Sequence, residues 1–206
     1  AKEGYPFIII PAAIVVASAL WGLNLIAFFF FIIAIFMVWF FRNPEREIPE
    51  DKGAVVAPAD GKVIKIERCL EARFLKEQAL KVSIFMNLFS VHINRAPFSG
   101  EVLGVYYNSG KFFAANLDKA SLENEQNAIL IKTEDGKKIL FIQIAGLIAR
   151  RIVCYIKIGD HLVKGQRFGL VRFGSRVDIF LPPTTELVVK AGQRGKAGES
   201  IIAYLK

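Results

Sequence analysis

The chain has 206 residues, of which 53% are hydrophobic and 22% are charged, and its formal net charge is +8. This length excludes a large multidomain machine and supports one compact domain with an appendage, or two very small domains. The high hydrophobic fraction excludes intrinsic disorder. The positive charge favours an anionic partner such as nucleic acid, acidic lipid headgroups or phosphorylated metabolites. Two widely separated cysteines, Cys69 and Cys154, predict neither a disulfide framework nor a metal site.

The first predicted element is an apolar segment, because Phe7–Phe41 contains no charged side chain. As one straight helix it would be about 52 Å long, whereas the hydrocarbon core of a membrane is about 30 Å thick. Trp21-Gly22-Leu23-Asn24 interrupts the segment, so we predict two arms, Phe7–Leu20 and Ile26–Phe41, joined by a turn. This pattern predicts a membrane helical hairpin, and one span preceded by an interfacial segment stays open.

A cleaved signal peptide is the alternative for this segment, since Ala17-Ser18-Ala19 resembles a small-residue cleavage site. Cutting there would leave Leu20–Phe41, which is still long enough to anchor the chain in a membrane. Basic residues lie on both sides of the apolar segment, at Lys2, Arg42, Arg46 and Lys52. By the positive-inside tendency we predict that the following domain lies on the cytoplasmic face of the cell membrane.

The polar linker Asn43–Arg46 divides an anchor, residues 1–46, from a domain at 47–206. Short β-rich runs dominate this domain, and Glu134-Asp135-Gly136 is a hairpin turn between two of them. The runs are Ala54–Ala57, Gly61–Ile66, Leu80–Met86, Gly100–Tyr107, Ala128–Lys132, Lys138–Ile144, Ile152–Ile156, Phe168–Val171, Val177–Leu181, Leu187–Lys190 and Ile201–Tyr204. We predict a mostly β sandwich or barrel with few short helices, of which Cys69–Leu80 and Ala114–Asn124 are the candidates.

Two segments of the domain repeat a pattern of strand, glycine turn and strand. Ile156–Gly159 is followed by Gly165, and Val188–Gly192 is followed by Gly198 at the same spacing. Such turns, together with Ala57–Val63, are typical of the half-motifs of lipoyl-like barrel-sandwich domains. Glycine turns between unrelated hairpins explain the same pattern.

Conventional catalytic motifs are absent, since the sequence has no G-x-S-x-G, P-loop, G-x-G-x-x-G or H-E-x-x-H pattern. No nucleic-acid partner is predicted, because aromatic and basic residues do not interleave. Asp60 lies in a Pro-Ala-Asp-Gly turn, where its function as a turn cap is a sufficient explanation. His92 follows a buried strand and is the candidate general base, whereas His161 lies in a turn. A structural, hydrogen-bonded histidine is the alternative for His92.

Gly174-Ser175 lies between two predicted strands and by spacing is a turn or bulge. A serine hydroxyl can also attack the carbonyl of the residue before it, and glycine there permits the strained backbone that this attack needs. The ester so formed can undergo β-elimination to dehydroalanine, which becomes a pyruvoyl group. The first step needs a base oriented by a carboxylate, which His92 and Asp60 would supply.

Several segments together resemble the phosphatidylserine decarboxylases of the short prokaryotic type. They are Val56-Ala57-Pro58-Ala59-Asp60-Gly61, Ile84–Asn87 with Val91–Pro97, Asn124–Asn127, Ile144–Gly146 with Ala149–Ile152, and Phe173-Gly174-Ser175. Each segment is a weak signal alone, but jointly they are specific and cover the domain from about residue 50 to the C-terminus. The resemblance implies a proenzyme that cuts itself between Gly174 and Ser175 into a β chain, residues 1–174, and an α chain, residues 175–206, which stay associated.

The resemblance also implies residue roles. Self-cleavage is implied to use Asp60, His92 and Ser175, and the pyruvoyl group formed at Ser175 is the implied covalent cofactor and Schiff-base electrophile. The implied reaction converts phosphatidylserine of the membrane to phosphatidylethanolamine, with His92 as candidate proton donor. Candidate contacts to the anionic headgroup are Arg95, Arg150, Arg151 and Arg176.

Two other functions stay open on the sequence alone. A non-enzymatic, membrane-anchored lipoyl-like adaptor would leave the chain whole. A decarboxylase for a soluble amino acid would explain Gly174-Ser175 but not the apolar segment. A lipid substrate explains both features and is therefore preferred, while association of the enzyme into a homo-oligomer is left open.

Overall fold

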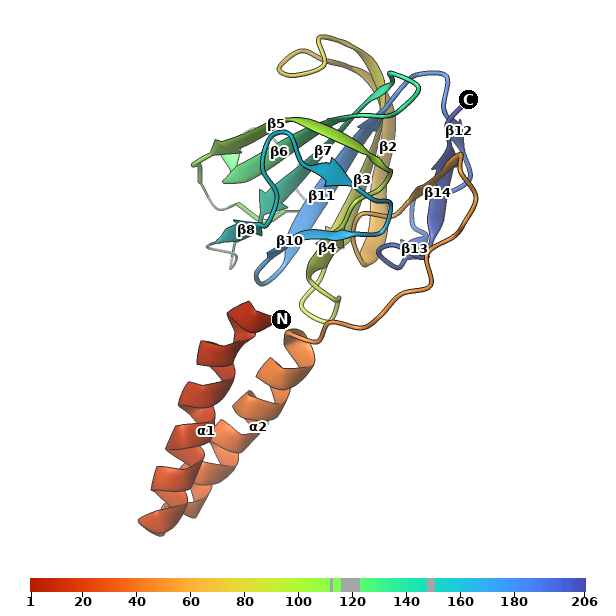
Figure 1. Ribbon diagram of the computed structural model, residues 1–206. Coiled ribbons are helices and arrows are strands. Elements are labelled where there is room, and N and C mark those ends of the chain that lie inside the picture. Colours follow the sequence, from red (N-terminus) through yellow and green to blue (C-terminus); the bar gives the residue numbers. More distant parts are fainter. Residues whose placement is uncertain (112, 116–122, 148–150) are drawn as a thin grey trace. The chain divides into compact units, whose positions relative to one another are not determined.

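A computed structural model describes residues 1–111, 113–115, 123–147 and 151–206 (Figure 1). The chain divides into two compact units, Ala1–Pro44 and Glu45–Lys206. Each unit is described by itself below.

The first unit is a pair of apolar helices. The short 3-10 helix η1, Lys2–Gly4, leads into α1, Tyr5–Leu20, and α2 is Asn24–Phe40. The predicted arms are thus helices, and the interruption between them is a turn in which Gly22 has a φ of 72°. Glycine adopts this left-handed conformation without steric cost, which is why the chain can reverse there.

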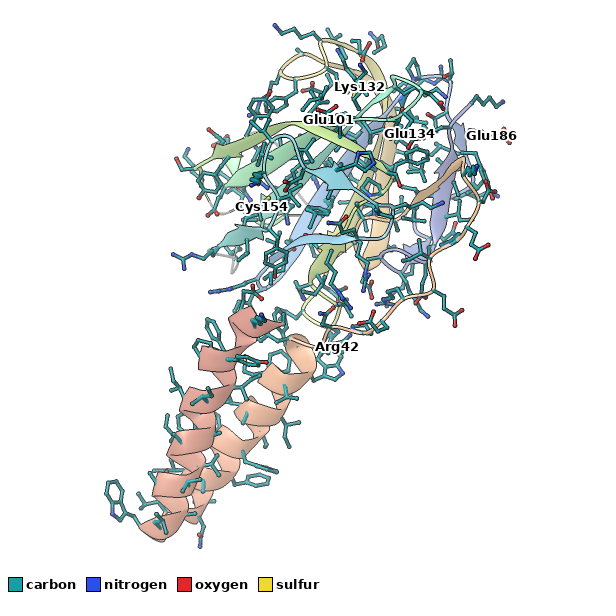
Figure 2. The ribbon with its side chains drawn as sticks, in the orientation of Figure 1. Arg42, Glu101, Lys132, Glu134, Cys154 and Glu186 are labelled. Atoms are coloured by element: carbon teal, nitrogen blue, oxygen red, sulfur yellow. The ribbon has the colours of Figure 1, made fainter. Side chains whose placement is uncertain are left out.

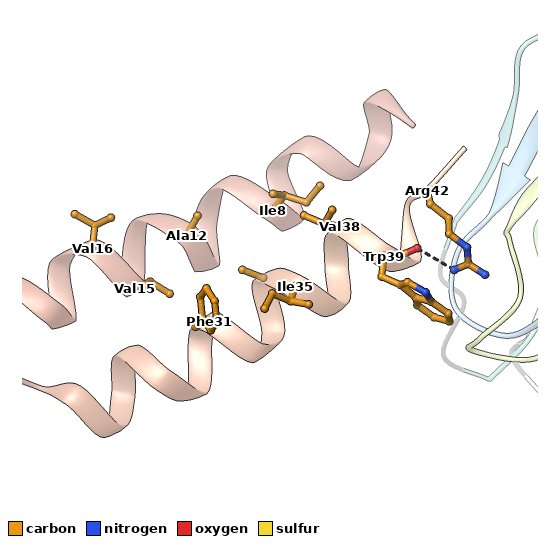
Figure 3. Close-up of a pocket in the computed structure, with 10 residues that line it drawn as sticks. Ile8, Ala12, Val15, Val16, Phe31, Ile35, Val38, Trp39 and Arg42 are labelled. Atoms are coloured by element: carbon orange, nitrogen blue, oxygen red, sulfur yellow. Dashed lines mark hydrogen bonds between the residues drawn. The ribbon is translucent and has the colours of Figure 1, made fainter. Parts of the chain in front are cut away.

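The two helices pack along their length, and Phe7 stacks on Phe41 with ring centroids 5.5 Å apart. A groove of about 670 Å³ between them is lined almost entirely by apolar side chains, among them Ala12, Phe31 and Ile35 (Figure 3). By length and composition the stretch Lys2–Leu20 is sufficient to cross a membrane, whereas α2 with its 17 residues is shorter. This apolar helix supports an association of the first unit with a membrane.

The second unit is built from strands. They are β1 Ala54–Val56, β2 Gly61–Glu71, β3 Glu77–Met86, β4 Ile93–Arg95, β5 Gly100–Asn108, β6 Gln126–Lys132, β7 Lys138–Ala145, β8 Ile152–Cys154, β9 His161–Leu162, β10 Arg167–Val171, β11 Ser175–Leu181, β12 Glu186–Leu187, β13 Arg194–Gly195 and β14 Ile201–Tyr204. Each run of strand predicted from the sequence overlaps one of them. The mostly β fold class is therefore confirmed.

The strands form three antiparallel sheets. The largest has the order β13-β2-β3-β11-β7-β6-β5-β9 and curls around the core, and the smaller two are β1-β14-β12 and β4-β10-β8 (Figure 1). β11 lies in the middle of the large sheet, with β3 on one side and β7 on the other. Ser175, its first residue, pairs with Met86 of β3 and Ala145 of β7. This register fixes the position of Ser175 from both sides.

β11 is buried on both faces of the sheet. Val177, Ile179 and Leu181 belong to the main hydrophobic core, while Phe180 packs in a second apolar cluster on the opposite face. This alternation follows from the two-residue period of a strand. The charged side chains of Glu101, Lys132, Glu134 and Glu186 lie on the outside of the domain (Figure 2), whereas Arg176 and Asp178 of β11 are buried.

The helix predicted over Cys69–Leu80 is wrong, because these residues belong to the hairpin of β2 and β3. The composition favours a helix, but the buried carboxylate of Glu71 accepts the N–H groups of Arg73, Phe74 and Leu75 at 2.6–3.1 Å. The turn thereby obtains the hydrogen bonds that a helix would have supplied. Tertiary pairing overrides local propensity here. The other helix candidate, Ala114–Asn124, falls largely on residues 116–122, which lie outside the described residues.

The turn predicted at Glu134–Gly136 joins β6 and β7, and Gly136 has a φ of 81° there.

The two segments that repeat the pattern of strand, glycine turn and strand make equivalent hydrogen bonds. In each copy, two glycines with positive φ donate their backbone N–H groups to the two ends of a segment that begins with Ala-Pro. In the first copy Gly159 donates to the Val102 carbonyl and Gly165 to the Ala96 carbonyl. In the second copy Gly192 donates to the Val63 carbonyl and Gly198 to the Ala57 carbonyl. The segment Ala96–Val102 is therefore the counterpart of Ala57–Val63, a match that the sequence analysis missed.

Candidate active site

The connection between β10 and β11 has a strained backbone. Phe173 and Gly174 have φ values of 53° and 64°, both in the left-handed region. Glycine tolerates this conformation, but a residue with a Cβ atom is held there at a cost of about 1–3 kcal/mol. The strain lies directly before the Gly174–Ser175 bond that the sequence singled out.

His92 lies at this turn. Its Nε2 atom accepts the backbone N–H of Gly174 at 3.2 Å, and the side chain is buried. An Nε2 atom that accepts a hydrogen bond carries no proton, so it is in the form that can take one up. His92 comes from the end of the segment after β3 and is placed by the pairing of Ile93–Arg95 with β10. The structure therefore brings two of the predicted residues, His92 and Gly174, into contact.

The carbonyl group of Gly174 packs against the backbone of Gly146. A Cβ atom built at position 146 would lie 2.1 Å from the Gly174 oxygen, a distance at which atoms overlap. Only glycine leaves space for this carbonyl. Gly146 is held in place because the preceding Ala145 pairs with Ser175 and its carbonyl accepts a hydrogen bond from Asn124 at 2.7 Å.

The side chain of Ser175 is completely buried beside polar groups of the core. Its hydroxyl donates a long, weak hydrogen bond to Met86 Sδ at 3.9 Å. The same sulfur accepts from Asn94 at 3.5 Å, and Asn94 in turn accepts from Gln143 at 2.8 Å. These amides form a connected buried network, which fixes the surroundings of Ser175.

A cavity of about 330 Å³ has Gly174 in its wall. Its wall is mostly apolar and is made by Phe85, Asn87, Leu88, Phe89, Ala114, Ala115, Leu147, Phe173 and Gly174. A small molecule entering the cavity would thus contact Gly174, the residue directly before Ser175. Among the described residues no three His, Cys, Asp or Glu side chains gather in a way that could hold a metal ion.

Comparisons with known proteins identify the relationship. The family model for phosphatidylserine decarboxylase matches residues 33–203. The phosphatidylserine decarboxylase proenzymes of Geotalea uraniireducens (strain Rf4) and Desulfotalea psychrophila are 50% and 46% identical to this chain over 205 residues, and both alignments cover 100% of this chain and 96% of the relative. The corresponding proenzyme of Syntrophus aciditrophicus (strain SB) is 50% identical over 211 residues, covering 97% of this chain and 94% of the relative.

The chain belongs to the phosphatidylserine decarboxylase family. The resemblance stated from the sequence motifs is confirmed, and the protein is a decarboxylase enzyme. The non-enzymatic adaptor considered above is therefore not supported.

Asp60 of this phosphatidylserine decarboxylase family member has hydrogen-bond partners outside the turn at Phe173 and Gly174. Its Oδ1 atom accepts the N–H of Ala197 at 2.7 Å, and its two oxygens accept from Arg46 at 3.1 and 2.9 Å. Arg46 also reaches Glu199 at 3.3 Å. Within the described residues no hydrogen bond joins Asp60 to His92. The structure thus brings His92 to Gly174 but does not place Asp60 in the same hydrogen-bonded group.

The repeat gives Asp60 a structural counterpart. Ser99 occupies the equivalent position in the other copy, and its hydroxyl accepts the N–H of Lys164 at 2.9 Å as Asp60 accepts that of Ala197. Capping this turn therefore needs an oxygen acceptor but not a charge. Asp60 therefore carries a negative charge that its counterpart Ser99 lacks and that capping does not require.

The arginines proposed for the headgroup lie in different environments. Arg176 is almost completely buried, and its Nε and Nη2 atoms form a bidentate ion pair with Asp178 at 2.8 and 2.9 Å. Arg95 is also buried and donates to the Gly165 carbonyl at 2.9 Å. Burial, followed by the positive charges of Arg167 and Arg46, lowers the pKa of Arg95. Among the four, Arg151 is exposed, and Arg150 lies outside the described residues.

Sequence reasoning missed three residues at this site. Phe173 was quoted only as part of the motif Phe173-Gly174-Ser175, because a positive φ on phenylalanine leaves no pattern in a sequence. Gly146 was quoted only as part of a motif, because its contact with Gly174 joins residues far apart in the chain. Arg172, whose N–H donates to the Arg151 carbonyl at 3.4 Å, could have been found from its position two residues before Gly174.

Proposed function

We propose that this protein decarboxylates phosphatidylserine to phosphatidylethanolamine with a pyruvoyl group that it makes from its own Ser175. The observation that carries the proposal is the strained turn at Phe173 and Gly174, with His92 at the Gly174 N–H and Gly146 leaving space for the Gly174 carbonyl. The family and the names of the relatives support the substrate, and their description as proenzymes agrees with processing.

The residues present fit such a group. Ser175 is buried at the start of β11 and is paired on both sides, so a carbonyl formed there would be rigidly held. The mostly apolar cavity is lined by Gly174, directly before Ser175, so a substrate bound in it would lie beside the group.

Self-cleavage begins when the Ser175 hydroxyl turns from Met86 toward the Gly174 carbonyl carbon. His92 takes up the hydroxyl proton as the oxygen attacks, the C–N bond breaks, and the proton passes to the departing nitrogen, leaving an ester. Loss of the α-proton of Ser175 then expels the carboxylate of Gly174 and leaves dehydroalanine. Addition of water and loss of ammonia convert this residue to the ketone. The strain stored at Phe173 is released when the bond breaks.

In the decarboxylation, the pyruvoyl group would supply a ketone able to condense with the substrate amine and to accept the electron pair released with CO2. The pairing of β11 with β3 and β7 would hold this ketone in place. His92, adjacent to the same turn, would return a proton to the substrate carbon. Arg151, which is exposed, and Arg172 at the turn carry positive charges suited to the phosphate or carboxylate of the headgroup.

We also propose that the first unit anchors the enzyme in the cell membrane as a hairpin, with the second unit on the cytoplasmic face. Lys2 and Arg42 lie at the same end of the helical pair, because Gly4 packs directly against Phe41. The Arg42 guanidinium lies 3.8 Å from the centroid of the Trp39 ring, an arrangement suited to a membrane interface. Positive charges at one end of both helices favour the cytoplasmic side.

The purified protein is expected to contain two polypeptides rather than one. Intact mass spectrometry under denaturing conditions should find residues 1–174 and residues 175–206, the smaller blocked to Edman degradation because its first residue has no amine. Under native conditions the two chains should stay together, since β11 is inserted between β3 and β7. A single full-length polypeptide without a carbonyl reactive toward hydrazines would overturn the proposed function.

The proposed contribution of Asp60 to cleavage can be separated from its capping role with Asp60→Ser. Ser99 shows that a serine caps this turn, so the variant should fold. If the carboxylate supports His92 as a general base, cleavage should slow by at least about 100-fold, measured as the conversion of full-length chain on denaturing gels over time. Cleavage at the wild-type rate, with an unchanged melting temperature, would show that Asp60 only caps the turn.

A further inference from the structure

We propose that two exposed apolar side chains at the mouth of the cavity, Phe89 and Leu147, insert into the lipid surface and receive the acyl chains of the substrate. This pair is called the rim below. The inference rests on the proposed function and deepens it, because it states how a lipid reaches a buried bond.

The size of the cavity requires the acyl chains to lie outside it. Its volume of about 330 Å³ is at the lower end of the range of small-molecule pockets, roughly 300–1,000 Å³. A phospholipid with two acyl chains is larger than the ligands that such pockets enclose. If the headgroup amine reaches Gly174 in the wall of the cavity, the chains must leave through the mouth.

The rim lies at that mouth. Phe89 and Leu147 line the cavity and are nevertheless 68% and 65% exposed. They come from different segments, one after β3 and the other after β7, so two parts of the chain contribute exposed apolar side chains to the cavity. Large apolar side chains exposed at the mouth of a cavity mark a surface that contacts an apolar partner.

The turn that carries Phe89 is rigid. Asn87 Oδ1 accepts both the N–H of Phe89 at 2.9 Å and the hydroxyl of Ser90 at 3.2 Å, and the Asn87 carbonyl accepts the N–H of Ser90 at 3.1 Å. These bonds fix the backbone of the turn from which the Phe89 side chain projects. The positive charges of Arg151 and Arg172 nearby in the chain fit the anionic headgroups of the same lipid surface.

The test compares a rim double variant, Phe89→Ser with Leu147→Ser, with a control double variant, Ile158→Ser with Val163→Ser. The control residues are 62% and 60% exposed and do not line the cavity. Each full-length enzyme is assayed on phosphatidylserine in phosphatidylcholine vesicles and on a short-chain phosphatidylserine dissolved as monomers. The ratio of kcat/KM on vesicles to kcat/KM on monomers should fall by about tenfold or more for the rim variant, from the burial of two large apolar side chains. The control should leave the ratio unchanged.

A second measurement does not depend on activity. The chain for this measurement carries Ser175→Ala, Cys69→Ser and Cys154→Ser. Either Phe89→Cys or Ile158→Cys then supplies a single cysteine, which is labelled with a polarity-sensitive fluorophore. Phosphatidylcholine brominated in its acyl chains should quench the label at 89 and not the label at 158. Equal quenching at both positions, or an unchanged activity ratio in the rim variant, would overturn the inference. If the unmodified enzyme had no activity on either substrate, the proposed function would be contradicted. The fluorescence result would still decide whether the rim contacts lipid.

Discussion

A Ser175→Ala chain should remain one polypeptide of 206 residues and should have no decarboxylase activity. The hydroxyl that attacks the Gly174 carbonyl is then missing, so neither the ester nor the ketone can form. The variant should still fold, because the hydroxyl makes a weak contact, 3.9 Å from Met86 Sδ, and an alanine fits the same buried position. Denaturing mass spectrometry and a CO2-release assay on the same preparation would measure both results.

The matched control is Ser83→Ala. Ser83 is also a completely buried serine of the large sheet, in β3 opposite Asp178 of β11, and it is not at a strained turn. It should be cut and active like the unmodified protein. If Ser175→Ala retained decarboxylase activity, the proposal of a pyruvoyl group at this position would be wrong, whatever the state of the chain.

Much of the fold could be predicted because its strands are short apolar runs separated by glycine, proline, asparagine and aspartate. The strands that escaped prediction, β4, β9 and β13, have only two or three residues and are mostly polar or charged, whereas the equally short β1, β8 and β12 overlap longer runs that were predicted. The false helix at Cys69–Leu80 has a different cause. Glutamate favours a helix in isolation, but in the fold the Glu71 carboxylate accepts hydrogen bonds from the N–H groups of a turn. No local sequence pattern predicts this turn.

The candidate site also has a part that the sequence could predict and a part that it could not. Gly174, Ser175 and His92 could be proposed because their chemistry is rare, a Gly-Ser bond between strands and one of only two histidines. The surroundings of the bond could not. The pairing of Arg46 with Asp60, the burial of Arg176 against Asp178 and the backbone of Phe173 depend on contacts across the fold or on φ values. A single sequence can propose reacting groups, whereas the contacts that would position them come from residues distant in the chain.

Gly146→Ala tests whether the position of the Gly174 carbonyl matters for cleavage. The added methyl group would lie 2.1 Å from that oxygen, and Gly146 cannot easily move because Ala145 is paired with Ser175 and bonded to Asn124. The carbonyl must therefore be displaced from the position that Ser175 attacks. A displacement of about 1 Å in a reacting group can cost about 100-fold in rate, so we expect cleavage to slow by at least that factor. Densitometry of the uncut chain over time would measure the rate.

Alanine substitutions at two other glycines serve as controls. They show whether Gly146→Ala acts through a steric clash or through the loss of glycine's conformational freedom. At Gly174, with a φ of 64°, a Cβ atom would meet nothing within 4 Å, so Gly174→Ala adds only backbone strain of about 1–3 kcal/mol, which is released when the bond breaks, and should slow cleavage less than Gly146→Ala does. At Gly53 the nearest atom would be 3.6 Å away, and Gly53→Ala should be cut normally. The melting temperature of uncut Gly146→Ala should match that of uncut Ser175→Ala if the fold tolerates the change. Rapid cleavage of Gly146→Ala would mean that the carbonyl reacts from a different position, and the contact with Gly146 would then have no part in the reaction.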